Sequence, residues 1–140
     1  VGVTQIDAGS NIGIGGYSSG TIKGEKQQFM LSDPRSLDEV VGELVDMGMI
    51  TSFCTADYRC GRTGGCFMGF SKSGKIQGFC MPNAVLTFAE YLLDYASPAT
   101  REKGWVLLEK ELESLPVDGP REIVAGYLER IKAGERDLYL

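Results

Sequence analysis

The stretch Ser36-Leu-Asp-Glu-Val-Val-Gly-Glu-Leu-Val-Asp-Met-Gly48 contains both end signals of a helix. Ser36 and Glu39 have the spacing of a capping box, in which each side chain bonds the other residue's backbone N–H group. Gly48 suits the left-handed turn that ends many helices. Between them, apolar residues recur at helical spacing and predict one buried face. These residues are Leu37, Val40, Val41, Leu44 and Val45.

Short strands are predicted on both sides of this helix. Residues 1–8 are rich in β-branched side chains, and residues 49–53 read as a buried strand. A strand–helix–strand unit requires a parallel sheet, and two strands with one helix cannot cover both faces of it. The fold class predicted is therefore α/β: residues 1–53 form the tail of a larger α/β barrel or sheet whose earlier part is missing.

Residues 54–140 are predicted to form a separate, mainly α-helical C-terminal domain. Asn83 is expected to cap a helix over residues 84–95, and Ser97-Pro98 to begin one that reaches about Leu115. A last helix is predicted over residues 121–133, and residues 134–140 are expected to dock loosely or fray. The predicted core residues are Leu86, Phe88, Tyr91, Leu92, Tyr95, Trp105, Leu108, Leu112, Ile123, Val124, Tyr127, Leu128 and Ile131.

The composition excludes several classes of partner. A net charge of −5 argues against a general nucleic-acid binder. No apolar stretch approaches the ~20 residues that a membrane span needs, so no membrane partner is expected. Four cysteines in 140 residues are too few for a disulfide scaffold, which favours a reduced, cytoplasmic setting. The start at Val1, without Met, indicates a fragment of something longer.

All four cysteines lie between positions 54 and 80, and the chain has no histidine. Thiolates are soft ligands for zinc, copper(I) or iron–sulfur clusters. The spacing of Cys54, Cys60, Cys66 and Cys80 matches neither a zinc ribbon nor a ferredoxin. A metal or cluster site, structural thiols, and redox or disulfide chemistry therefore stay open. Cys54 follows a predicted strand at its carboxyl end, where α/β folds bind ligands, and nearby glycines predict a pliable loop.

Several motifs together resemble one family. They are Thr4-Gln-Ile-Asp-Ala-Gly-Ser10, Gly15-Gly-Tyr17, Ser36-Leu-Asp-Glu-Val40, Ser52-Phe-Cys-Thr-Ala56, Tyr58-Arg59, Gly61-Arg-Thr-Gly64, Phe67-Met68 and Phe79-Cys80 with Pro82-Asn83-Ala84. They resemble the radical S-adenosylmethionine (SAM) tyrosine lyase that matures iron-only hydrogenase, a relative of the thiamine-pathway tyrosine lyase. The resemblance spans essentially the whole chain. It implies that residues 1–53 are the last strands and helix of a truncated radical SAM (β/α) barrel, and that residues 54–140 are the biotin and thiamin synthesis associated domain.

The resemblance implies an auxiliary 4Fe–4S cluster held by a Cys-x2-Cys-x22-Cys motif. Cys54 and Cys80 match its first and third positions, whereas Asp57 stands at the second. A carboxylate is a harder and more labile iron ligand than a thiolate. Cys60 and Cys66 match no position of the motif and are possible substitutes, of which Cys60 is preferred because it lies near Cys54 and a glycine follows it. The metal and cofactor ligands expected are therefore Cys54, Cys80, and Cys60 or Asp57.

In the intact enzyme, the resemblance implies cleavage of tyrosine and assembly of an iron–carbon monoxide–cyanide precursor at this cluster. S-adenosylmethionine and a second 4Fe–4S cluster would lie in the rest of the barrel, which is the expected partner. This chain is not expected to be active alone, and an open sheet edge predicts self-association. The competing hypothesis is a non-catalytic structural or docking module, with a decayed cluster site and free or disulfide-bonded cysteines.

Overall fold

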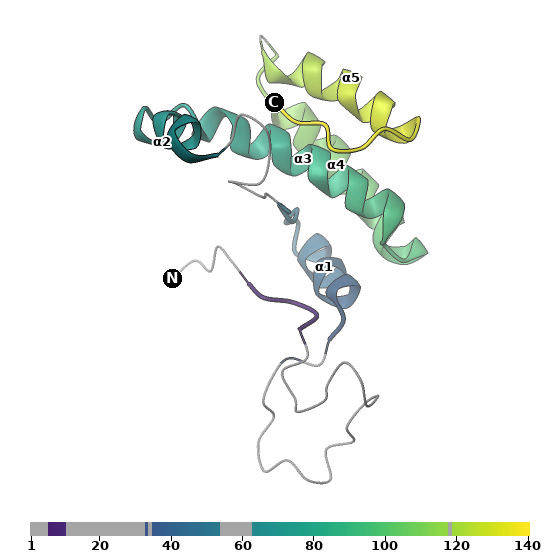
Figure 1. The fold of residues 1–140 in the computed structure, drawn as a ribbon. Helices are drawn as coiled ribbons and strands as arrows, with labels where there is room; N and C mark the ends of the chain where they lie inside the picture. Colours follow the sequence, from purple (N-terminus) through teal and green to yellow (C-terminus); the bar gives the residue numbers. More distant parts are fainter. Residues whose placement is uncertain (1–5, 11–32, 34, 54–62, 118) are drawn as a thin grey trace, which may run out of the picture.

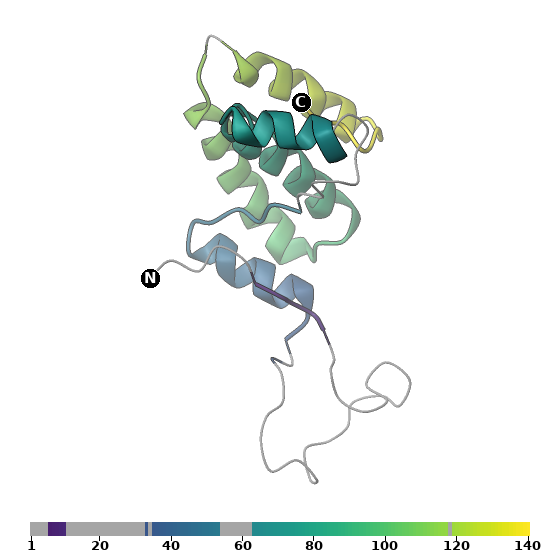
Figure 2. The ribbon, with the colours of Figure 1, turned by 60° about the vertical axis from the view of Figure 1, so that its left-hand side comes forward.

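The computed structural model describes residues 6–10, 33, 35–53, 63–117 and 119–140, and within them the chain forms five α-helices. Figure 1 shows α3 running through the middle of a helical bundle, with α4 and α5 beside it. Helix α1 contacts α4, and Figure 2 shows it below the bundle. The helices are α1 (Leu37–Asp46), α2 (Gly64–Lys72), α3 (Gln77–Asp94), α4 (Pro98–Ser114) and α5 (Pro120–Lys132).

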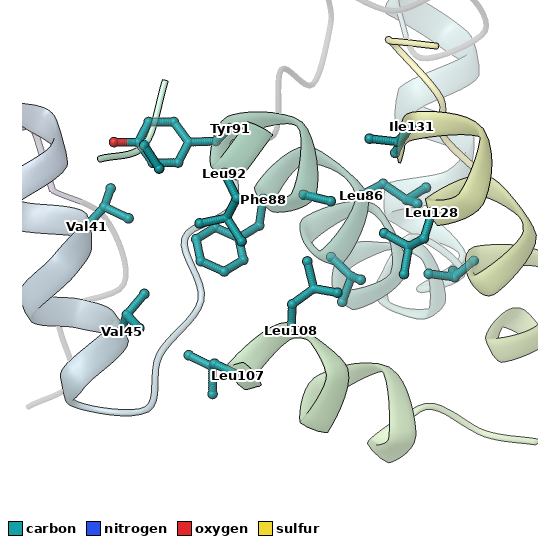
Figure 3. Close-up of a cluster of buried hydrophobic side chains, with 14 of the residues drawn as sticks. Val41, Val45, Leu86, Phe88, Tyr91, Leu92, Leu107, Leu108, Leu128 and Ile131 are labelled. Carbon is teal, nitrogen blue, oxygen red and sulfur yellow. The ribbon is translucent and has the colours of Figure 1, made fainter. Parts of the chain in front are cut away.

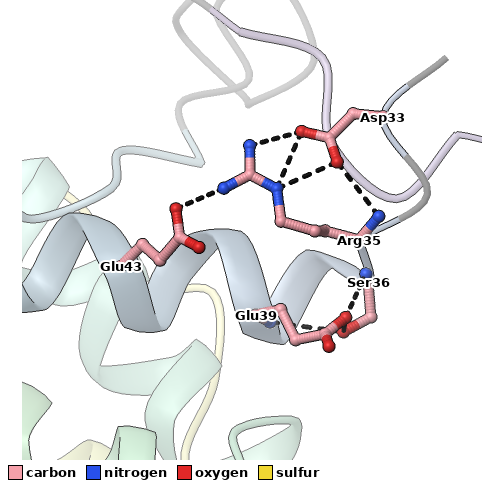
Figure 4. A network of polar contacts seen from close by, with 5 residues as sticks. All are labelled: Asp33, Arg35, Ser36, Glu39 and Glu43. Atoms are coloured by element: carbon pink, nitrogen blue, oxygen red, sulfur yellow. Dashed lines mark hydrogen bonds and ion pairs between the residues drawn. The ribbon is translucent and has the colours of Figure 1, made fainter.

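Helix α1 confirms the capping box. The Glu39 N–H donates to the Ser36 Oγ at 3.2 Å, and the Ser36 N–H donates to the Glu39 carboxylate at 2.7 Å (Figure 4). Gly48 has a φ of 75°, as expected after a helix end. Val41 and Val45 are buried as predicted, but Leu37 is 39% exposed, because it begins the helix away from the bundle.

Most of the residues that helical periodicity predicted to be buried do lie in the core. Figure 3 shows side chains from four of the helices meeting in one apolar cluster. At Gly104, an added Cβ would lie 2.5 Å from Leu92 Cδ2, so the missing side chain lets α4 approach α3 closely. The largest fully buried side chains are Phe88, Leu86, Leu92, Leu108, Ile131, Val41, Val85 and Val124.

Two residues that were predicted to lie in the core are exposed. Tyr95 is 77% exposed and Ile123 is 49% exposed. Tyr95 is the residue that caps α3, where a φ of −128° leaves the helical path, so helical spacing no longer predicts where its side chain lies. Ile123 lies in the first turn of α5, next to the buried Val124, and faces away from the bundle.

The N-terminal boundary of α3 is also a correction. The helix begins at Gln77, not at residue 84, and passes through Pro82. Proline removes one helical hydrogen bond, so Pro82-Asn83 read as a helix start. Asn83 caps nothing and instead contacts Leu140. The expected pliable loop up to Cys80 is likewise wrong from Gly64 onward, because α2 and the first turn of α3 occupy it.

The predicted strands are not seen in the described residues. Residues 49–53 have no strand hydrogen bonds, and residues 1–5 lie outside the described part. A strand exists only where a neighbour completes its hydrogen-bond ladder, and no such neighbour lies beside residues 49–53 among the described residues. The structure therefore supports the helical C-terminal region, and the end of a barrel stays a proposal.

No helix in the described ranges is long and apolar enough to cross a membrane.

Candidate functional site

Of the four predicted ligands, only Cys80 lies in the described part of the chain. It ends the first turn of α3, its side chain is exposed, and its thiol donates to the Ile76 carbonyl at 3.3 Å. The N-terminal end of a helix carries partial positive charge, which favours an anionic group nearby. An accessible thiol that is not packed into the core fits the role of a soft metal ligand.

Cys54, Asp57 and Cys60 lie in residues 54–62, outside the described residues, so the structure does not test whether they meet Cys80. The residue before this segment is well anchored. Phe53 stacks on Tyr91 of α3, with ring centroids 4.9 Å apart and an angle of 21° between the planes. The segment with three predicted ligands therefore begins against the same helix that carries Cys80.

The segment after residue 62 leads into α2, which folds back against the start of α3. Phe70 and Phe79 meet edge to face, with centroids 5.9 Å apart. Cys66 lies on α2 and is exposed, and Met68 is 47% exposed. Within the described ranges, no three Cys, Asp, Glu or His side chains gather closely enough to hold a metal. The predicted ligands other than Cys80 lie in residues 54–62, outside the described part of the chain.

Sequence reasoning missed the polar centre of the bundle, which is Asp38 in the first turn of α1. Its carboxylate accepts hydrogen bonds of 3.2 Å from the Tyr91 hydroxyl, the Ser97 N–H and the Thr100 hydroxyl. Burial alone would raise the pKa of Asp38, but these hydrogen bonds outweigh burial and lower it below its ordinary 3.8. Burial and the Asp38 charge raise the pKa of Tyr91 to about 12. One carboxylate thus ties α1 to α3 and to the start of α4.

We expect Asp38→Asn to lower the free energy of unfolding by about 1–3 kcal/mol at neutral pH, because part-buried donors lose a charged acceptor. A lowered carboxyl pKa in the folded state stabilises the fold above the ordinary value near 3.8. That contribution disappears as the pH falls through the lowered pKa. The free energies of unfolding in urea of wild type and variant should therefore approach each other as the pH falls below about 4.

The matched control for this prediction is Asp46→Asn. Asp46 is also on α1, but it forms an exposed ion pair with Lys103 at 2.6 Å. Such surface pairs contribute little. If Asp38→Asn were as harmless as Asp46→Asn, the carboxylate would not hold the helices together.

A second charged network precedes α1 and lies at the surface (Figure 4). The Arg35 guanidinium pairs with Asp33 and with Glu43. Hydrogen bonds from Arg35 lower the pKa of Asp33 to about 2, and hydrogen bonds to Asp33 and Glu43 raise the pKa of Arg35. This network fixes the entry of the chain into α1, and it carries no group placed for chemistry.

Two cavities adjoin α1. The first, of about 590 Å³, is largely apolar and opens between α1 and the flanking segments. The second, of about 690 Å³, lies between the start of α1, α3 and the C-terminal residues. The first is lined by residues including Ile6, Leu37, Val40, Leu44, Met49 and Ile50, and the second by residues including Asp38, Phe53, Tyr91, Tyr95, Arg136 and Asp137.

Comparison with known proteins places this helical region. No protein-family model and no curated protein matches the chain. A solved structure does match, that of HydG, described as a maturase of the [FeFe]-hydrogenase. The two chains are 47% identical, the TM-score is 0.80, and the match covers 99% of this chain but 30% of HydG. Over nearly all its length, this chain is therefore similar to part of a hydrogenase maturase, as its motifs predicted.

Proposed function

We propose that this chain is the auxiliary-cluster region of a radical SAM lyase that acts in the maturation of [FeFe]-hydrogenase. The observation that carries this proposal is the 47% identity to HydG over 99% of the chain. Identity at that level, with a TM-score of 0.80, supports a shared role for the region as well as a shared fold. The match covers 30% of HydG. We therefore expect the activity of the whole enzyme to depend also on segments outside the matched region.

The proposed ligands are Cys54, Cys80 and, in the second position of the motif, Cys60 or Asp57. When bound, the 4Fe–4S cluster would supply the site at which an iron takes up carbon monoxide and cyanide derived from tyrosine. The chain's own contribution is to present Cys80 on the first turn of α3, exposed and beside the positive end of the helix. Thiolate-held iron requires reduced cysteines, so we expect the parent enzyme in the cytoplasm.

The apolar cavity beside α1 is the proposed contact with the rest of the barrel. Leu37 and Met49 at its edge are 39% and 47% exposed, and Ile6 is 50% exposed. In the same cavity wall, the Thr51 hydroxyl oxygen is buried and has no hydrogen-bond partner among the described residues. Exposed apolar side chains next to an unsatisfied polar atom are typical of a surface that another segment covers. In isolation, the same surface is expected to drive self-association.

The proposal is tested by anaerobic reconstitution of the chain with iron and sulfide. We expect a brown protein with broad absorbance near ~400 nm and an electron paramagnetic resonance signal after reduction. Cys54→Ala should lose both features. Cys60→Ala and Asp57→Ala, compared side by side, identify the second ligand, because only one of them should lose the signal.

The competing hypothesis is a structural module without a cluster. It makes the opposite prediction for the same experiment: a colourless protein in every variant, with helical content unchanged by iron. That result would leave the similarity to HydG as a similarity of fold alone.

A further inference from the structure

The residues that follow α5 lie along α3 as an ordered strap (residues 136–140), rather than docking loosely or fraying as the sequence predicted. Figure 1 shows this segment returning beside α3. At its beginning, the Arg136 guanidinium donates to both carboxylate oxygens of Asp94, at 2.7 and 2.5 Å. Both side chains are only about a third exposed, at 35% and 34%, so the pair is partly shielded from water.

The strap's backbone is then held by two further side chains of α3. The Glu90 carboxylate accepts from the N–H groups of Asp137, at 2.8 Å, and Leu138, at 3.4 Å. The Asn83 amide accepts from the Leu140 N–H at 2.8 Å and donates to the Leu140 carbonyl at 3.4 Å. Both contacts are to backbone groups, so they fix the path of the strap irrespective of its side chains.

The three holding residues share one face of α3. Asn83, Glu90 and Asp94 are spaced by seven and four residues, which places them in one row of a helix. The row is about 16 Å long at 1.5 Å per residue. Four extended residue steps cover about 14 Å, and the long Arg136 side chain covers the rest. The strap therefore runs antiparallel to α3, from its end back toward its beginning.

The strap is held by its backbone and by its side chains. Asp137 has a φ of 62°, a left-handed conformation that aspartate tolerates better than most non-glycine residues. Leu138 and Leu140 pack against the apolar core. The strap thus belongs to the folded domain.

The strap ends where α3 is weakest. Pro82 has no N–H group, so it cannot donate the usual helical hydrogen bond to the carbonyl of Gly78, four residues earlier. Gly78 itself lowers the helix propensity of the first turn. Cys80 lies between these two residues and is exposed, and Asn83 follows it by three residues, about one turn. Just beyond this weak point, side-chain hydrogen bonds join Asn83 to the distant Leu140.

We propose that Asn83 is a positioning residue for Cys80, and that the strap holds it in that role. By fixing α3 just beyond Pro82, the Asn83–Leu140 contact keeps the turn that carries the thiol helical. The inference deepens the proposed function: a ligand on a fixed turn keeps a metal longer than one on a fraying turn. Asn83, which is not part of the cysteine motif, would then be needed for the chain to hold the cluster firmly.

The first test uses the metal-free chain and needs no cluster. Hydrogen exchange should be about tenfold faster at the Cys80 and Met81 amides in Asn83→Ala, with α4 and α5 unchanged. Asn83→Asp keeps the acceptor for the Leu140 N–H and should exchange close to wild type. Lys103→Gln, a remote surface change on α4, is the control. Unchanged exchange, or an equal increase in every helix, would overturn the proposal.

The second test uses the chain loaded with iron and sulfide. Release of iron to a chelator should be about tenfold faster in Asn83→Ala than in wild type, and Asn83→Asp should restore the slower rate. Equal release rates would overturn the link between the strap and the ligand. If wild type bound no iron at all, the proposed function would fail, whereas the exchange experiment would still decide whether the strap holds the turn of Cys80.

Discussion

Replacing Cys80 with alanine should reduce the iron bound by the reconstituted chain from about four atoms to less than one. Alanine offers no ligand, and within the described ranges no other cluster of metal-binding side chains can take its place. The fold should survive the change, because the Cys80 side chain is exposed and contributes nothing to the core. Circular dichroism of the same samples checks that point.

The matched control is Cys66→Ala. Cys66 is also an exposed cysteine at a helical position, but it lies on α2 and matches no position of the ligand motif. We expect it to keep its full iron content. Equal iron in the two variants would remove Cys80 from the ligand set, and equal loss would make Cys66 a ligand as well.

Phe88→Ala should destabilise the fold by about 3–5 kcal/mol. Phe88 is fully buried on α3, at the centre of the cluster that joins α1, α3, α4 and α5. Removing its ring leaves a cavity in the apolar cluster that also contains Leu92 and Leu108 (Figure 3), and the packed helices cannot close it. The free energy of unfolding in urea measures the loss.

Val106→Ala is the control for this prediction. Val106 lies on α4 and is 69% exposed, so its truncation should change stability by less than about 0.5 kcal/mol. A small loss at Phe88 would mean that the helices do not share a single core. A large loss at Val106 would mean that its face of α4 is covered by another surface in solution.

Local signals predicted much of the helical fold. Ser36 with Glu39, and Ser97 with Pro98, are start signals that depend only on neighbouring residues, and both begin helices in the structure. The sequence did not predict helix α2 or the true start of helix α3, for two different reasons. Gly64, Gly65 and Gly69 lower the helix propensity of α2, and Pro82 imitates a helix boundary inside α3. Both were decided by packing, such as the Phe70–Phe79 contact, which a local pattern cannot show.

The candidate site could be predicted only where a motif exists. Cys80 was identified by its match to the ligand motif of the family that the chain resembles, and the structure adds that it is exposed on a helix. Asp38 was missed and Asn83 was given the wrong role, because their partners lie 53–62 and 57 residues away along the chain. A single polar residue on a helix gives no hint of a partner so distant. The proposed ligands can therefore be recognised from a sequence motif, whereas the contacts that position them depend on the tertiary structure.

The proposed function requires that this helical region hold an iron–sulfur cluster. The most direct test is to count iron and acid-labile sulfide per folded chain after anaerobic reconstitution and removal of unbound metal. The account predicts about four of each per chain. A folded chain with no tightly bound iron or sulfide would contradict it.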